Sequence, residues 1–337
     1  MQHKGLGVLG ITAALIGTML SGAEGDAAAL QLRIVPNESL RYAWTIATTS
    51  QSHGKERGRD FTLSTEVNYT MTLLLRGLPP KREGPPPTPA APPLADARGS
   101  EGANVAVRIQ DFTYSDKRAI GDAKAEVSVS RGHVKCTENG KVIVDSDNDI
   151  GADRMADYQR YMRNMESAEL RVFLDQAGRQ SKPEGDAILV DALKAGGAEG
   201  IFPILAGKTA RAGESWESSF KLPQVGGFRL AQPAVVRSKM TFSKWVAKAG
   251  KDLAQIDVTS RWETRELKGE NDSGLLVEFS QVDGGGTGSC LFDPATGRFA
   301  EGALETATKY RIDGERDGQT TGLDVVGKTR FTFTAVP

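Results

Sequence analysis

Strict alternation of apolar and polar residues is the feature that most limits what this chain can fold into. It is clearest in one run of apolar residues at every second position: Val67, Tyr69, Met71, Leu73 and Leu75. Near the C-terminus the same period recurs in Leu304, Thr306, Thr308, Tyr310 and Ile312. Because successive side chains of a strand point to opposite faces, this period predicts half-buried strands of an antiparallel sheet.

Such strands occur in two stretches of the chain that resemble each other. Val67–Thr72 is echoed by Val236–Thr241, and Val105–Ile109 is echoed in the same order by Ala254–Val258. Similar segments repeated in one order are typical of an internal repeat. The expected fold is therefore mainly β (α+β), with two similar antiparallel β-rich halves and helices between them. Both a sandwich and curved sheets fit this pattern.

The region between the two halves has a helical rather than a β period. Met155, Tyr158, Met162 and Met165 recur at the spacing of one helix face, within an expected helix Asp153–Leu170. Together with a second short helix from Asp186, this predicts a helical segment over residues 153–195. The expected organisation is a signal peptide at 1–23, a first half at 24–200 with a proline-rich loop at 79–102, and a second half at 201–337.

The N-terminus is typical of a secretory signal peptide. His3 and Lys4 precede the uncharged apolar run Leu6–Leu20, and Ser21-Gly22-Ala23 supplies small residues for cleavage. The run is shorter than the ~20 residues that a membrane span needs. We expect an exported, soluble protein of the periplasm or the extracellular space, with no transmembrane segment after the signal is cleaved.

Charge and motif content exclude several function classes. The 42 Lys+Arg nearly balance the 43 Asp+Glu, so no basic footprint for nucleic acid is expected. No H-E-x-x-H, C-x-x-C or G-x-S-x-G motif occurs, and Gly284–Cys290 lacks the lysine of a P-loop. We interpret that glycine run as a flexible turn before a strand. No catalytic residue and no cofactor is predicted; a secreted hydrolase using dispersed Asp and Glu carboxylates is the alternative.

Two further sets of residues are candidates for a metal site and a disulfide. Asp145, Asp147 and Asp149 alternate like the ligands of a Ca²⁺ loop, although Ile150 stands where an EF-hand needs glycine. A solvated turn before a helix is the alternative. Cys136 and Cys290 are the two cysteines, and export favours a disulfide between the halves. Two buried thiols are the alternative.

The leading functional hypothesis is a non-enzymatic binding or structural module of the cell envelope. Its ligand is unknown, with a lipid or another apolar molecule as the candidate, and an envelope component or a protein is the candidate partner. The candidate ligand contacts are Tyr69, Met71, Leu73, Tyr158, Met162, Met165, Met240 and Phe242. Methionine adapts to varied apolar surfaces, which favours a ligand; the alternative is that these residues fill a closed core.

Five short motifs carry a resemblance to a known family. They are Asp145-Ser146-Asp147, Phe173-Leu174-Asp175-Gln176-Ala177-Gly178-Arg179, Ile201-Phe202-Pro203, Gly213-Glu214-Ser215-Trp216 and Phe292-Asp293-Pro294-Ala295-Thr296-Gly297-Arg298. With them, the chain resembles an uncharacterised family of exported bacterial β-rich proteins, a domain of unknown function. The proline-rich loop and the two cysteines depart from that pattern. The resemblance implies a shared fold and export, and no catalytic residues.

Overall fold

The structure is a computed structural model that describes residues 26–56, 59–79, 102–131, 133–148, 150–151, 166–186, 202–225, 228–270, 276–316 and 319–337. Over these ranges the backbone is almost entirely β, and only residues 166 and 167 are helical. The prediction of a mainly β protein is therefore confirmed. The helices expected between the halves are not seen in the described ranges, which leave out most of 153–195.

One end of the expected helix Asp153–Leu170 is wrong, because Glu169–Asp175 forms a strand. Leu170, Val172 and Leu174 are buried there, and the residues between them are not. This alternation is the period of a strand, and pairing with neighbouring strands outweighs the helical spacing of the preceding residues. Within the described part of the chain, no helix is long and apolar enough to cross a membrane.

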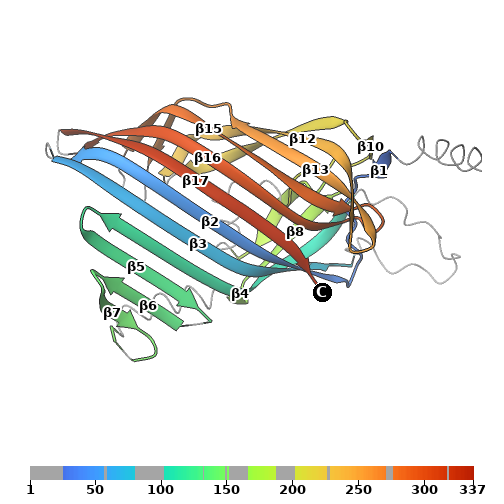
Figure 1. The fold of residues 1–337 in the computed structure, drawn as a ribbon, viewed down its shortest axis with the longest axis horizontal. Helices are drawn as coiled ribbons and strands as arrows, with labels where there is room; N and C mark the ends of the chain where they lie inside the picture. Colours follow the sequence, from blue (N-terminus) through green and yellow to red (C-terminus); the bar gives the residue numbers. More distant parts are fainter. Residues whose placement is uncertain are drawn as a thin grey trace, which may run out of the picture.

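A single antiparallel sheet of 15 strands dominates the fold (Figure 1). Its first-half strands are β2 (Ser39–Glu56), β3 (Arg59–Gly77), β4 (Gly102–Ile120), β5 (Ala123–Ser130), β6 (His133–Glu138), β7 (Lys141–Asp145), β8 (Glu169–Asp175) and β9 (Gln180–Gly185). Its second-half strands are β11 (Ser215–Val225), β12 (Phe228–Lys248), β13 (Lys251–Trp262), β14 (Leu267–Glu270), β15 (Leu276–Asp293), β16 (Arg298–Arg316) and β17 (Gln319–Val336). A separate pair is formed by β1 (Ala27–Ala29) and β10 (Thr209–Arg211).

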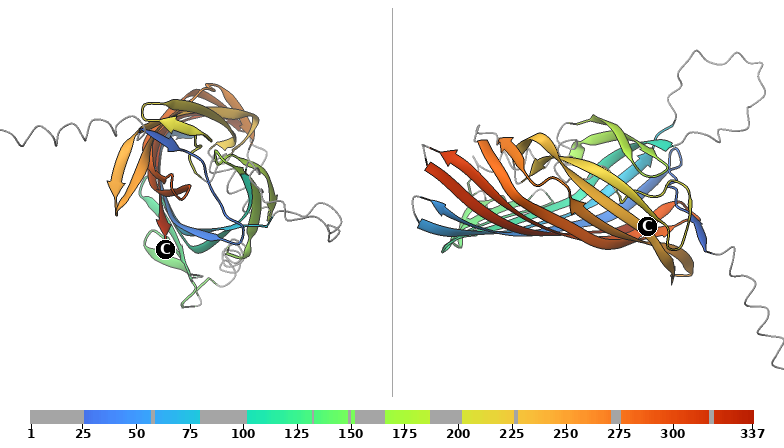
Figure 2. Two further views of the ribbon diagram at one scale, coloured as in Figure 1. Left: turned by 90° about the vertical axis from the view of Figure 1, so that its right-hand side faces the viewer. Right: turned by 90° about the horizontal axis from the view of Figure 1, so that it is seen from above.

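The two halves of the chain meet edge to edge within this sheet. The strand order is β11-β12-β13-β15-β16-β17-β2-β3-β4-β5-β6-β7, with β14 paired to β12 and β15, and with β8 and β9 continuing from β4. Strand β17 pairs with β2 over its length, from Leu323 opposite Gly54 to Val336 opposite Arg41. Viewed along its length, the sheet curls until its two sides face each other (Figure 2).

The inner side of the curl, the concave face, is apolar, and the outer side, the convex face, is polar. On β2 the alternation is direct: Tyr42 and Trp44 are buried, whereas Arg41, Ala43 and Thr45 are exposed. Buried residues from β2, β3 and β4 share one hydrophobic cluster with those of β12, β13 and β15. The period that the sequence shows therefore separates a core-facing surface from a solvated one.

Aromatic rings fill one end of the concave face, which we call the aromatic end. Phe202 packs edge-on to Tyr42 at 4.7 Å and stacks on Phe299 at 5.0 Å between ring centroids. Phe333 lies 5.3 Å from Phe202 and 5.8 Å from Phe299. Each such pair adds about 0.5–1.5 kcal/mol beyond the area that it buries.

Three connecting segments cover the aromatic end. Leu32 N–H donates to the carbonyl of Gln176 (2.7 Å), and Leu205 N–H donates to that of Ala177 (2.8 Å). The indole Nε1 of Trp216 donates to the carbonyl of Ile204 at 2.8 Å. These bonds satisfy backbone groups that lie against the core and so stabilise the cover.

Glycines let neighbouring side chains lie flat on the curled strands. A Cβ on Gly302 would come within 2.5 Å of the Phe333 ring, and one on Gly286 within 2.6 Å of the Thr306 methyl carbon. The interpretation of Gly284–Cys290 as a flexible turn is wrong, because these residues are the middle of β15. Side chains from adjacent strands occupy the space that the glycines leave.

Candidate ligand-binding site on the concave face

A row of small and hydroxyl-bearing residues crosses the concave face next to the aromatic end. Consecutive cross-strand partners define this hydroxyl row: Ser218, Ser238, Ser260, Gly286, Thr306, Thr329 and Thr48. The hydroxyls of Thr48 and Thr329 are hydrogen-bonded at 3.1 Å. Thr306 is exposed although it points to the concave side. The small side chains therefore leave the middle of this face incompletely filled.

At the end of the hydroxyl row lies a buried carboxylate with an arginine. The row continues from Thr48 to Val67 and then to Asp116 on β4. Asp116 accepts hydrogen bonds from Tyr114 Oη (2.9 Å) and from Arg118 Nε (2.9 Å) and Nη2 (2.6 Å). The Asp116 side chain is 5% exposed and that of Arg118 is 62% exposed. The carboxylate is thus the buried end of this Asp116–Arg118 pair and the guanidinium its accessible end.

A β-bulge turns these residues toward the concave face. In β3 and β4, Thr70 pairs with Thr113 but Thr72 pairs with Gln110, so one residue of β3 opposes two of β4. Asp111, one of the two, has φ of 50°. Extra residues of this kind shift the phase of a strand. The buried positions consequently change from Val107 and Ile109 to Phe112, and the same face continues through Asp116.

The pair borders a pocket between β4 and β5. It has a volume of about 220 Å³ and is lined by Tyr114, Asp116, Arg118, Ala125 and Val127. Sites that enclose a whole drug-sized ligand are about 300–1,000 Å³. A pocket of this size holds one end of a larger molecule, whose remainder would extend along the concave face.

The electrostatics of the pocket favour hydrogen-bond donation over proton transfer. Burial, and then the hydrogen bond to Asp116, raise the pKa of Tyr114. The hydrogen bond to Asp116 also raises the pKa of Arg118. Both groups therefore keep their protons over the physiological range, and neither is suited to act as a base or nucleophile.

On one side of the Asp116–Arg118 pair the concave face is uncharged, whereas on the other side Glu138 of β6 stands opposite Ala125. On β2, β3, β16 and β17, the concave positions whose side chains the structure describes carry no Asp, Glu, Lys or Arg. Charged residues of these strands face the convex side instead. A charged pair beside an apolar surface is unusual enough to mark a candidate site.

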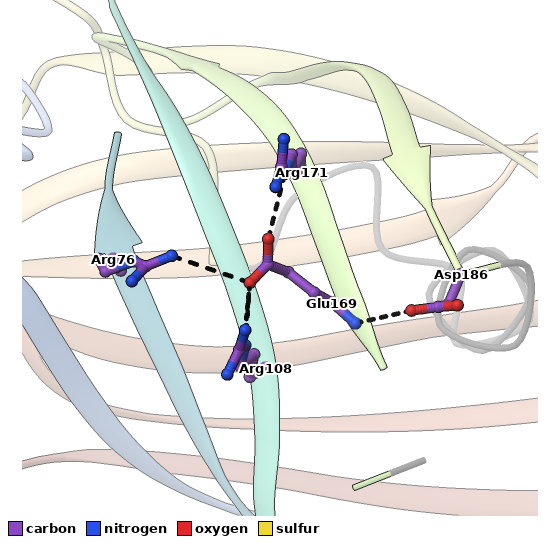
Figure 3. Close-up of polar contacts among 5 residues, drawn as sticks. All are labelled: Arg76, Arg108, Glu169, Arg171 and Asp186. Carbon is purple, nitrogen blue, oxygen red and sulfur yellow. Dashed lines mark hydrogen bonds and ion pairs between the residues drawn. The ribbon is translucent and has the colours of Figure 1, made fainter. Parts of the chain in front are cut away.

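A second carboxylate cluster lies on the convex face and joins three strands (Figure 3). Glu169 on β8 accepts hydrogen bonds from Arg108 Nε (2.9 Å) and Nη2 (2.7 Å) on β4 and from Arg171 Nε (3.1 Å). Arg76 on β3 approaches the same carboxylate at 3.9 Å. The hydrogen bonds from Arg108, ahead of those from Arg171, lower the pKa of Glu169. This Glu169 cluster holds the short strand β8 to the rest of the sheet.

The structure brings five of the predicted ligand contacts together and leaves three undescribed. Leu73, Met240 and Phe242 are buried in the cluster on the concave face, and Tyr69 and Met71 pack against it partly buried. Tyr158, Met162 and Met165 lie outside the described residues. Asp116 and Arg118 were not predicted from the sequence. The sequence feature that could have indicated them is their spacing: Asp116 and Arg118 continue the every-second-residue period of Phe112 and Tyr114.

The acidic loop is organised as a turn. Asp145 accepts hydrogen bonds from Asp147 N–H (3.0 Å) and from Asn148 Nδ2 (3.1 Å), and the latter is the main cause of its lowered pKa. Asp147 Oδ1 is hydrogen-bonded to His133 Nδ1. Asp149 lies outside the described residues, and within them no three His, Cys, Asp or Glu side chains are placed to hold a metal. The Ca²⁺ site stays a prediction.

The predicted disulfide between Cys136 and Cys290 is wrong in this structure. Both side chains are buried thiols on the concave face, on β6 and β15. The structure has no disulfide between them, and β6 and β15 are not paired in the sheet. Burial, and then the charge of Asp257, raise the pKa of Cys290, which keeps this thiol protonated.

Comparison with known proteins gives structural neighbours only. No family model and no curated protein matches the chain, so the family resemblance stays a prediction. An outer membrane channel from Pseudomonas putida F1 aligns with a TM-score of 0.21 and 8% identity, covering 93% of this chain and 98% of that one. The translocator domain of the autotransporter NalP from Neisseria meningitidis aligns at 0.15 and 6%, covering 87% and 88%. Pseudomonas aeruginosa OccK7 aligns at 0.20 and 7%, covering 89% and 99%.

These neighbours correct the predicted location. The expectation of a soluble protein of the periplasm or the extracellular space is contradicted, because the solved structures that the chain is similar to include an outer membrane channel and an autotransporter translocator. The coarser prediction, a β-rich protein, agrees with the backbone.

Proposed function

We propose that the protein is a binding module of the cell envelope that takes up an apolar or amphipathic ligand on the concave face of its sheet. The observation that carries this proposal is the hydroxyl row. It borders the large apolar side chains that lead to the aromatic end and leaves Thr306 exposed inside the curl. Protein interiors are normally filled, so an underfilled concave surface supports a ligand.

Partly buried apolar residues beside the row supply the contact surface. Leu304, Phe331, Ile46 and Tyr69 form the adjacent cross-strand row, together with Tyr114, and all five are only partly buried. Covering such side chains with a ligand releases about 25 cal/mol for each Å² of apolar surface removed from water. An aliphatic chain laid along this row would contact several strands at once.

A matched pair of tryptophan substitutions on β16 tests the proposal. Thr306→Trp places a bulky ring in the hydroxyl row, whereas Ala307→Trp places the same ring on the convex face one residue away. The probe is a neutral N-phenylnaphthylamine dye whose emission rises in apolar surroundings. We expect Thr306→Trp to weaken dye binding about fivefold or more, which corresponds to about 1 kcal/mol, and Ala307→Trp to leave it unchanged.

Circular dichroism and urea denaturation of both variants show whether they are folded. Two results would overturn the proposal: a wild-type protein that does not bind the dye, or equal binding by two folded variants. Because both substituted positions are exposed, neither ring has to replace a buried side chain.

A further inference from the structure

We infer that the Asp116–Arg118 pair is the head-group site of the concave face and receives the anionic end of an amphiphile, a carboxylate or a phosphate. This inference rests on the proposed function, since it names the class of ligand that the same face binds. One end of the ligand carries a negative charge, and Arg118 is the residue that contacts this end.

The sign of the charge follows from which half of the pair is accessible. Asp116 is almost completely covered, and its oxygens are already occupied by Tyr114 and Arg118. Arg118 is 62% exposed and uses Nε and Nη2 toward the carboxylate, which leaves Nη1 for another acceptor. A ligand therefore meets the positively charged guanidinium of Arg118, which Asp116 holds in position. Hydrogen bonds between a guanidinium and an anionic oxygen are about twice as strong as neutral ones.

A contribution to the stability of the fold does not explain why a charged pair occupies this position. An ion pair with one buried and one exposed partner contributes little net stability, because the desolvation of the buried carboxylate offsets much of the attraction. The neighbouring positions on the concave face are filled by apolar or small uncharged residues, for example Val67 and Thr65 opposite the pair. A pair kept in such surroundings fits a role in recognising a charge.

The pocket places the two ends of an amphiphile at different parts of the sheet. Its volume of about 220 Å³ accommodates a head group and the first carbons of a chain. Tyr69 lies next to Tyr114, with ring centroids 5.1 Å apart, and leads to the partly buried Met71. The head group at Arg118 would thus direct an alkyl chain along Tyr69 toward the aromatic end.

The arginines of the Glu169 cluster do not offer the same combination. Arg108 and Arg171 have exposed guanidinium groups, but they lie on the convex face and both already bind the Glu169 carboxylate. Glu184 stands opposite Arg171 and supplies a further negative charge. An anionic head group would meet the carboxylates of Glu169 and Glu184 beside these arginines.

Four amphiphiles of one chain length test the inference by displacement of the neutral dye: lauric acid, lauryl phosphate, lauryl alcohol and laurylamine. We expect lauric acid or lauryl phosphate to bind about tenfold more tightly than the alcohol, and the amine no more tightly than the alcohol. The ranking of the two anions then separates a carboxylate head group from a phosphate head group.

Variants identify Arg118 as the contact. The double substitution Asp116→Asn with Arg118→Gln removes both charges and leaves no unpaired buried carboxylate. We expect it to abolish the preference for the anion while the affinity for the alcohol stays within about twofold, since the apolar contacts are untouched. Arg118→Lys keeps the positive charge and should retain most of the preference. Lys117→Gln, on the convex face of the same strand, is the matched control and should bind like wild type.

The outcomes separate this inference from the proposed function. If wild type binds the anions and the alcohol equally, or if the double variant keeps the preference, the inference is overturned and the binding function stands. If neither the dye nor any of the four amphiphiles binds, the proposed function itself fails.

Discussion

Strand β4 carries an arginine–carboxylate cluster on each of its faces, and the two differ in composition and setting. On the convex face, Arg108 is one of three arginines around Glu169. On the concave face, a single arginine, Arg118, faces Asp116. The Glu169 carboxylate is 16% exposed and that of Asp116 is 5% exposed. The convex carboxylate has three arginines around it, whereas the concave carboxylate has one.

The difference shows how one chemical pairing serves two purposes. In the Glu169 cluster, arginines from β3, β4 and β8 share a carboxylate, so the interaction spans strands and fixes the position of β8. In the Asp116–Arg118 pair, both residues and the hydrogen-bonded Tyr114 come from β4 itself, and no strand is held by it. The convex cluster therefore has a structural explanation that the concave pair lacks.

Removing the concave arginine should have the largest effect on stability. Arg118→Ala leaves Asp116 as a buried carboxylate without its counter-charge, and we expect a loss of about 2–3 kcal/mol in the free energy of unfolding, measured in urea. Lys117→Ala, an exposed neighbour on the other face, should cost about 0.5 kcal/mol or less. Equal losses in the two variants would mean that Asp116 does not depend on Arg118.

Neutralising the convex carboxylate should have an intermediate effect that depends on pH. Glu169→Gln should cost about 1–2 kcal/mol at neutral pH, because hydrogen bonds from Arg108 and Arg171 lose their ionic partner. The folded state lowers the pKa of Glu169 below its usual 4.5, so its contribution is present above pH 4.5 and disappears as the pH falls through the lowered value. Urea denaturation of both proteins from neutral to acidic pH should show the gap closing; a constant gap would contradict this.

Removing one convex arginine should have the smallest effect. Arg171→Gln should cost only about 0.5 kcal/mol, since Arg108 keeps both of its hydrogen bonds to Glu169 and Arg76 remains nearby. The same urea measurement checks it. A loss as large as that of Glu169→Gln would show that the three arginines act as a unit rather than as replaceable partners.

Much of the sheet follows from the sequence, because alternation directly reports which side chains share a face. All five apolar residues of the alternating run are in β3 and point to the concave side, as the period predicts: Val67, Tyr69, Met71, Leu73 and Leu75. The partner of a strand is a different matter. The pairing of β17 with β2 joins positions such as Phe333 and Trp44, which lie almost a whole chain apart. A strand shows the same alternation whichever strand it pairs with, so the alternation does not predict that β17 pairs with β2.

Predictions made from local composition were wrong where contacts with neighbouring strands determine the structure. The glycines of β15 are typical of turns, yet Thr306 and Leu304 cover them and the run is a strand. The two cysteines suggested a bridge because nothing in the sequence shows how many strands lie between them. The site was missed for a similar reason: whether Asp116 faces inward depends on where the bulge falls.

That bulge at Asp111 makes the chemistry of both surfaces depend on chain length rather than on residue identity. Deleting one residue there would restore the phase of the first part of β4 and exchange the two sides of the second part. Lys117 and Ser115 would then point inward, and Asp116 and Arg118 would point outward, with no side chain altered. In evolutionary terms, the insertion or deletion of a single codon at this position would bring the charged pair to the concave face or remove it in one step. No series of substitutions could reach the same arrangement so directly.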